Sequence, residues 1–92
     1  MNLNDIGKRM SELKEWGLEG NAIMKEFEFP DFKEAMIFVN NVALLAEKAV
    51  HHPVIIIDYN KVRITLTTHS EKAITEKDFE LAKEIDRLRD AS

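Results

Sequence analysis

The chain has 92 residues, of which 45% are apolar and 33% charged, and its formal net charge is −4. A chain of this length supports one hydrophobic core, so we expect residues 1–92 to form a single domain. The acidic balance argues against general binding to nucleic acid or to an anionic membrane, which a basic face would favour. The absence of cysteine excludes disulfides, thiolate nucleophiles and cysteine-ligated zinc.

Two further observations concern the membrane and export. The longest wholly apolar run, Val54 to Ile57, is far shorter than the ~20 residues that cross a bilayer. The first residues, MNLNDIGKRM, lack the apolar stretch of a signal peptide. We therefore expect a cytoplasmic protein that binds neither membrane nor nucleic acid.

The first predicted element is a helix over about residues 4–15, followed by a hairpin. Asn4 or Asp5 can cap this helix. Its apolar residues recur on one helical face: Ile6, Met10 and Leu13. Gly20-Asn21 then form a turn signal, and the alternation after it predicts a strand over 22–29 that pairs with the segment before the turn.

The main predicted helix follows this hairpin. Asp31 is its expected N-cap, with Glu34 three residues later as in a capping box. The helix should stop at His51-His52, because Pro53 disfavours helical geometry at the residue before it. One apolar stripe follows the helix: Phe32, Ala35, Met36, Val39, Val42, Ala43, Ala46, Ala49 and Val50.

A second hairpin and a last helix complete the chain. The β-branched residues 54–59 predict a strand, Asn60-Lys61 a tight turn, and the alternation over 62–69 a half-buried strand. Thr75 is the expected N-cap of the last helix, with Asp78 at its third position. The apolar stripe of that helix is Phe79, Ala82, Ile85 and Leu88.

The order of elements defines the predicted fold class. It reads helix, two strands, helix, two strands, helix, and each helix has a single apolar stripe. Two hairpins with such helices imply an α+β two-layer sandwich. We expect a four-stranded antiparallel sheet with all three helices on one face.

Three histidines carry the candidate chemistry. A hairpin that folds back at Asn60-Lys61 places the start of its first strand beside the end of its second. His51, His52 and His69 would then converge at one end of the sheet, with Glu47 one helical turn before His51. Since histidine readily exchanges protons near neutral pH, this arrangement predicts an acid–base site.

Each of these residues also has an alternative role. Histidines at a helix C-terminus favourably oppose its partial negative charge, and a histidine at a strand end can simply be solvated. Asp78 can cap its helix with no further function. Three histidines and a carboxylate could also bind zinc or copper, although adjacent histidines suit a metal less well than an i, i+4 pair. A glycine-rich phosphate loop and a serine nucleophile elbow are absent.

A compound pattern spans the second half of the chain. Its parts are Glu47-Lys48-Ala49-Val50-His51-His52-Pro53, Tyr59-Asn60-Lys61-Val62, Thr67-Thr68-His69, Thr75 and Asp78. This pattern resembles the signature of the pterin-4a-carbinolamine dehydratases. The resemblance covers nearly the whole chain, and the fold it implies agrees with the one predicted above.

The resemblance implies a hydro-lyase. Such an enzyme removes water from a 4a-hydroxytetrahydropterin to give a quinonoid dihydropterin, which recycles the pterin used by aromatic amino acid hydroxylases. By position, the acid–base residues would be His51, His52 and His69. The residues that bind substrate or orient the imidazoles would be Glu47, Thr67, Thr68 and Asp78. The resemblance implies no metal and no cofactor, because the pterin is the substrate.

Two positions depart from the family pattern. Val54-Ile55 stand where members usually carry a polar residue and then an aromatic one. The loop over 70–73 lacks the glycine that is common before the last helix.

The resemblance leaves a second class of function open. Some animal members bind a homeodomain transcription factor as a dimerisation cofactor, so a non-catalytic binding module is the alternative. The resemblance also suggests a homodimer or a homotetramer, in which the copies are joined by strands or by helices. An exposed sheet edge would otherwise be a liability for so small a domain.

Overall fold

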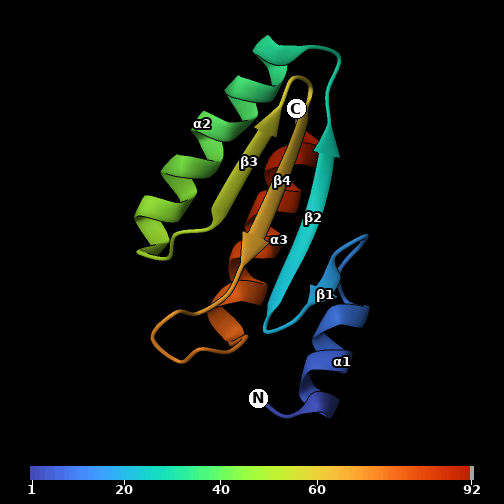
Figure 1. Ribbon diagram of the computed structural model, residues 1–92, viewed down its shortest axis with the longest axis vertical. Helices are drawn as coiled ribbons and strands as arrows, with labels where there is room; N and C mark the ends of the chain where they lie inside the picture. Colours follow the sequence, from blue (N-terminus) through green and yellow to red (C-terminus); the bar gives the residue numbers. More distant parts are fainter. Residues whose placement is uncertain (92) are drawn as a thin grey trace.

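The computed structural model describes residues 1–91 and has three helices and four strands in the predicted order (Figure 1). The elements are α1 (Leu3–Ser11), β1 (Gly17–Glu19), β2 (Ala22–Glu28), α2 (Phe32–Ala49), β3 (Val54–Asp58), β4 (Lys61–Leu66) and α3 (Glu76–Ala91). All strand pairs are antiparallel, and the strand order is β1-β2-β4-β3. The predicted α+β fold is thereby confirmed.

The two hairpins meet through β2 and β4 at the centre of the sheet. Ile23 pairs with Leu66, and Phe27 pairs with Val62. On the other side of β4, Val54 of β3 pairs with Thr65. This register brings the start of β3, the end of β4 and the start of β2 to the same end of the sheet.

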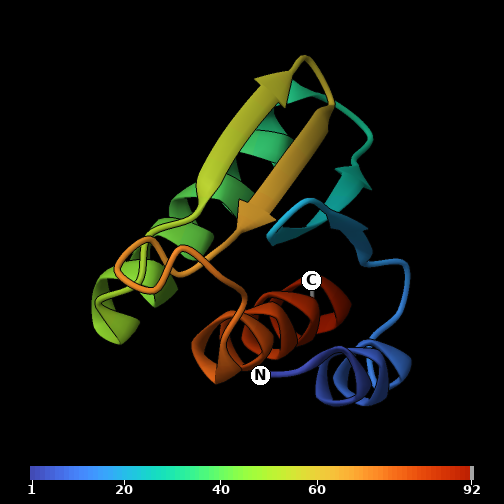
Figure 2. The same ribbon diagram turned by 60° about the horizontal axis from the view of Figure 1, so that its bottom comes forward.

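One face of the sheet forms the core. Its buried strand residues are Ile23, Phe27, Val62, Ile64 and Leu66. Figure 2 shows the helices on a single side of the sheet, and the buried residues of α2 and α3 belong to the same cluster as these strand residues. The apolar stripe predicted for α1 is partly buried against that cluster. The opposite face of the sheet is open to solvent along β3, where Val54 and Ile56 are about half exposed.

The first helix begins and ends earlier than predicted. Asn2, and not Asn4 or Asp5, is the N-cap, because its side chain accepts a hydrogen bond from the Asp5 N–H at 2.8 Å. The Asp5 carboxylate accepts in return from the Asn2 N–H, which completes a capping box. The helix ends at Ser11, and Glu15 lies in the left-handed region with a φ of 63°.

The main helix has the predicted cap and a different end. Asp31 accepts a hydrogen bond from the Glu34 N–H at 2.8 Å, as expected for an N-cap. The helix ends at Ala49 and not at His51-His52, because Val50 adopts a left-handed conformation. The helix therefore stops three residues before the position that Pro53 restricts. Within residues 1–91, no helix has the length and apolarity needed to cross a membrane.

The second hairpin also differs in its details. Its turn is Tyr59-Asn60 and not Asn60-Lys61, since Tyr59 takes a φ of 52° and Lys61 pairs with Asp58. The strand β4 ends at Leu66, three residues before the predicted end at residue 69. The chain turns there, and the backbone of residue 68 forms an isolated bridge with residue 73.

Candidate active site

The candidate residues lie where the C-terminal end of α2, the end of β4 and the start of α3 meet (Figure 1). The structure joins them into two separate imidazole–carboxylate pairs. His51 contacts Asp78, and His52 contacts Glu47. His69 belongs to neither pair.

The first pair is buried. The Nε2 atom of His51 lies 2.5 Å from Oδ1 of Asp78, and the Asp78 side chain is fully buried. A carboxylate oxygen that accepts a hydrogen bond here makes Nε2 the donor, and Nδ1 is the ring nitrogen left for other partners. The carboxylate therefore fixes both the orientation and the tautomer of His51.

Asp78 is itself held by two further hydrogen bonds. Its Oδ2 accepts from the Thr68 hydroxyl and from the Thr75 N–H, each at 2.9 Å. The Thr68 and Thr75 hydroxyls also bond each other at 2.7 Å. The predicted capping role of Asp78 is real, and the same carboxylate also binds an imidazole. The two roles coexist because a carboxylate can accept several hydrogen bonds at once.

The second pair is exposed. The Nε2 atom of His52 lies 2.5 Å from Oε2 of Glu47. The two side chains are 63% and 74% exposed, so solvent and small molecules reach them freely. The Glu47 carboxylate orients the His52 ring by accepting a hydrogen bond, as Asp78 does for His51. Water screens the charge interaction in this exposed pair more strongly than in the buried one.

Val50 explains why neighbouring histidines face different surroundings. Its backbone is left-handed, with φ 51° and ψ 45°, and its N–H bonds the carbonyls of Ala46 and Glu47. The His51 N–H then donates to the Ala46 carbonyl at 3.1 Å. This reversal of the chain turns His51 into the protein and leaves His52 on the surface.

The loop after β4 carries His69. The side chain of His69 is exposed, and within residues 1–91 its ring has no hydrogen-bond partner. Its neighbour Thr68 is buried against Asp78, which places the start of the loop at the buried pair. The hydroxyl of Thr67 donates to the backbone carbonyl of Asn21 at 2.6 Å, so it takes part in a contact within the protein.

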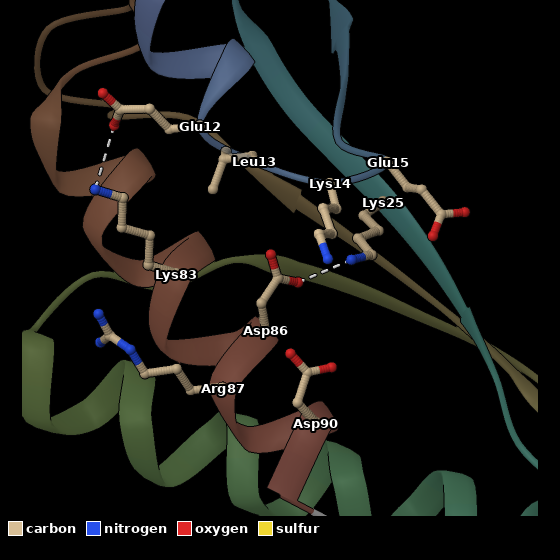
Figure 3. Close-up of a pocket in the computed structure, with 9 residues that line it drawn as sticks. All are labelled: Glu12, Leu13, Lys14, Glu15, Lys25, Lys83, Asp86, Arg87 and Asp90. Carbon is tan, nitrogen blue, oxygen red and sulfur yellow. Dashed lines mark hydrogen bonds and ion pairs between the residues drawn. The ribbon is translucent and has the colours of Figure 1, made fainter.

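Surface hollows only partly coincide with these residues. A hollow of about 500 Å³ between α2 and α3 has His51 in its wall, but neither His52 nor His69. Another, of about 570 Å³, lies between α3, Lys25 and the segment after α1, and no histidine lines it (Figure 3). There Lys25 and Asp86 form an ion pair at 2.9 Å, and Asp86 also accepts from the Trp16 ring N–H at 3.0 Å. These contacts tie α3 to β2.

The predicted metal alternative receives no geometric support. Within residues 1–91, no three histidine or acidic side chains are grouped closely enough to hold a metal ion. The two histidine pairs instead resemble the base-plus-orienting-group arrangement found in proton-transfer sites.

The chain matches known proteins over almost its full length. Residues 1–88 match the family described as Pterin 4 alpha carbinolamine dehydratase. The chain belongs to this family.

Curated relatives from archaea carry the same family name. A protein from Sulfurisphaera tokodaii is 49% identical over 84 residues, covering 91% of this chain and 90% of the relative. Another, from Sulfolobus acidocaldarius, is 42% identical over 86 residues, covering 94% of each chain. Both are named pterin-4-alpha-carbinolamine dehydratase as a provisional assignment.

Two solved structures have a similar fold. One, described as a transcriptional coactivator/pterin dehydratase from Brucella melitensis, has a TM-score of 0.91 and 36% identity over 96% of each chain. The other is described as a pterin dehydratase-like protein that is a RuBisCO assembly factor in the alpha-carboxysome. It has a TM-score of 0.70 and 26% identity, covering 82% of this chain and 89% of that one. The family fold therefore occurs in proteins with different described roles.

Proposed function

We propose that the protein is a 4a-hydroxytetrahydropterin dehydratase that acts by histidine acid–base catalysis. The observation that carries the proposal is the pair of adjacent histidines, each held by its own carboxylate. Membership of the pterin-4a-carbinolamine dehydratase family supplies the substrate class.

The proposed reaction moves two protons and breaks the C4a–O and N5–H bonds. A general acid protonates the C4a hydroxyl, and the C4a–O bond breaks to release water. A general base removes the proton from N5, and the electron pair of the N–H bond forms the C4a=N5 bond of the quinonoid dihydropterin. Imidazoles suit both steps because they exchange protons near neutral pH.

The two pairs differ in a way that suits these roles. The buried His51 is held in place by its contact with Asp78, whereas the exposed His52 is reachable from solvent. His69, at the surface of the neighbouring loop, completes the proposed acid–base set. Glu47 and Asp78 act on the substrate through the imidazoles they orient. We also propose that Thr67 and Thr68 bind the pterin edge through backbone groups, since the contacts of their hydroxyls lie within the protein.

The test is dehydration of a synthetic 4a-hydroxytetrahydropterin, followed against its spontaneous rate. We expect His52→Ala to lower kcat by about 100-fold or more, because a positioned proton-transfer group contributes roughly that factor. The fold should survive, since His52 is exposed. Lys33→Ala, an exposed change at the far end of α2, is the matched control and should retain full activity.

A wild-type rate no faster than the spontaneous reaction would contradict the proposal. It would favour the alternative, a non-catalytic binding module. The descriptions of the two structural neighbours as a coactivator and as an assembly factor give that alternative specific support. Unchanged turnover in His52→Ala would contradict the proposed catalysis by this histidine pair.

Self-association is the second part of the proposal. The sheet ends at β3, whose outer edge has no partner strand within residues 1–91. Exposed apolar strand edges favour pairing with another chain. We propose a homodimer or homotetramer in which a second copy covers this edge.

A further inference from the structure

We propose that Asn21 is a positioning residue for His69. Its side-chain amide holds the loop over 69–73 in the conformation that presents the His69 imidazole at the candidate site. This inference rests on the proposed function, because the acid–base role of His69 gives the contact its catalytic consequence.

Two hydrogen bonds tie the β1–β2 turn to the chain on both sides of His69. The Asn21 side-chain N–H donates to the Lys72 carbonyl at 3.0 Å. The Thr67 hydroxyl donates to the backbone carbonyl of Asn21 at 2.6 Å. One residue of the turn thus contacts the segment just before His69 and the segment just after it.

The loop needs this support because of its sequence. Lys72 adopts a φ of 52°, a left-handed conformation that favours glycine and is unfavourable for a lysine. The loop lacks the glycine usual in the family, and the Asn21 amide bonds the carbonyl of this unfavourable residue. The contact therefore stabilises the loop at Lys72, the residue whose own backbone conformation is least favourable.

The His69 ring depends on the loop backbone for its position. Within residues 1–91 the ring has no hydrogen-bond partner of its own. Inside the loop, the Lys72 N–H bonds the His69 carbonyl at 3.2 Å, so the residue held by Asn21 is bonded directly to His69. A change at Asn21 should therefore reach the imidazole through one backbone contact.

The experiment compares Asn21→Ala and Asn21→Asp in the dehydration assay. Alanine removes the N–H donor, and aspartate replaces it with a carboxylate oxygen that repels the Lys72 carbonyl. Asn21→Ala should therefore lower kcat by about three- to tenfold, the effect of losing one hydrogen bond, and Asn21→Asp should lower it at least as much. We expect KM to change less, because the contact acts on a proton-transferring group. Asn40→Ala, at an exposed position on α2, is the matched control and should leave kcat unchanged.

A double-mutant cycle separates positioning from general stability. If Asn21 acts through His69, Asn21→Ala should cause no further loss of kcat in a His69→Ala background. An equal loss in both backgrounds, or no loss in the wild-type background, would overturn the inference.

A readout independent of activity separates this inference from the proposed function. Backbone ¹⁵N relaxation should show lower order parameters over residues 69–73 in Asn21→Ala than in the wild type. Unchanged order parameters would mean that the Asn21–Lys72 hydrogen bond does not hold the loop. If the wild type does not accelerate dehydration, the proposed function fails and the positioning role fails with it. A lowered order parameter would then still establish the contact as a structural one.

Discussion

At the scale of single residues, Asp78 is the most constrained group of the candidate site. It is fully buried and accepts hydrogen bonds from a hydroxyl and a backbone N–H in addition to its contact with His51. Asparagine has the same shape, but one of its two terminal atoms is a donor. It must either leave the N–H of residue 75 without an acceptor or force His51 into the other tautomer.

We therefore expect Asp78→Asn to lower kcat by about 100-fold or more, since the proposed acid–base group would be held in the wrong protonation pattern. The free energy of unfolding should fall by about 1–3 kcal/mol, the cost of a buried unsatisfied polar group. Kinetics and urea unfolding measure the two effects. Asp58→Asn, at an exposed strand end, is the control. Full activity in Asp78→Asn would mean that His51 does not depend on this carboxylate.

At the scale of elements, the C-terminal end of α2 determines the directions of the two adjacent histidines. Val50 is β-branched, exposed and left-handed, a combination that costs about 1–2 kcal/mol relative to glycine in the same conformation. Val50→Gly should therefore raise the free energy of unfolding by up to about 1 kcal/mol, after the greater entropy of glycine in the unfolded chain is deducted. Val50→Ala is the matched control, because its Cβ retains most of the strain. Urea unfolding that shows Val50→Gly to be less stable than Val50→Ala would contradict this account.

The same elements show which features the sequence predicts and which it does not. Helices and strands were predicted correctly because their apolar periodicity is local and follows the buried face. The predicted start of α1 is wrong because Asn2, Asn4 and Asp5 can each act as an N-cap. The predicted end of α2 is wrong because Val50 takes an unfavourable left-handed conformation. The capping box of Asn2 and Asp5 is a local pattern that the prediction missed, whereas no local pattern marks a left-handed valine such as Val50.

The candidate site also has contacts that the sequence predicts and contacts that it does not. The capping role of Asp78 follows from its spacing from Thr75, whereas its contact with an imidazole is implied only by the family resemblance. Asn21 has no such pattern, since its partner Lys72 is 51 residues away and both belong to polar turns. Of the three histidines that are predicted to converge, His51 and His52 are each paired with a carboxylate, and His69 takes part in neither pair.

At the scale of the whole molecule, the two edges of the sheet are unequal. β1 has three residues, whereas β3 has five and carries the exposed apolar side chains Val54 and Ile56. On α2, the exposed side chain of Leu44 offers the alternative, helix-mediated contact. A chain of this size gains from covering such surface, because it buries a smaller fraction of its own surface than a larger domain does.

We expect the wild-type chain to be a dimer or tetramer in solution, with the β3 edge in the interface. Ile56→Lys should shift it toward a monomer, because a lysine on an edge strand opposes pairing with another strand. Size-exclusion chromatography with light scattering, repeated over a range of protein concentrations, measures the change. Leu44→Lys is the matched comparison on α2. If Leu44→Lys dissociates the assembly and Ile56→Lys does not, the copies are joined by helices and the β3 edge stays open. A wild-type monomer at all concentrations would contradict both arrangements.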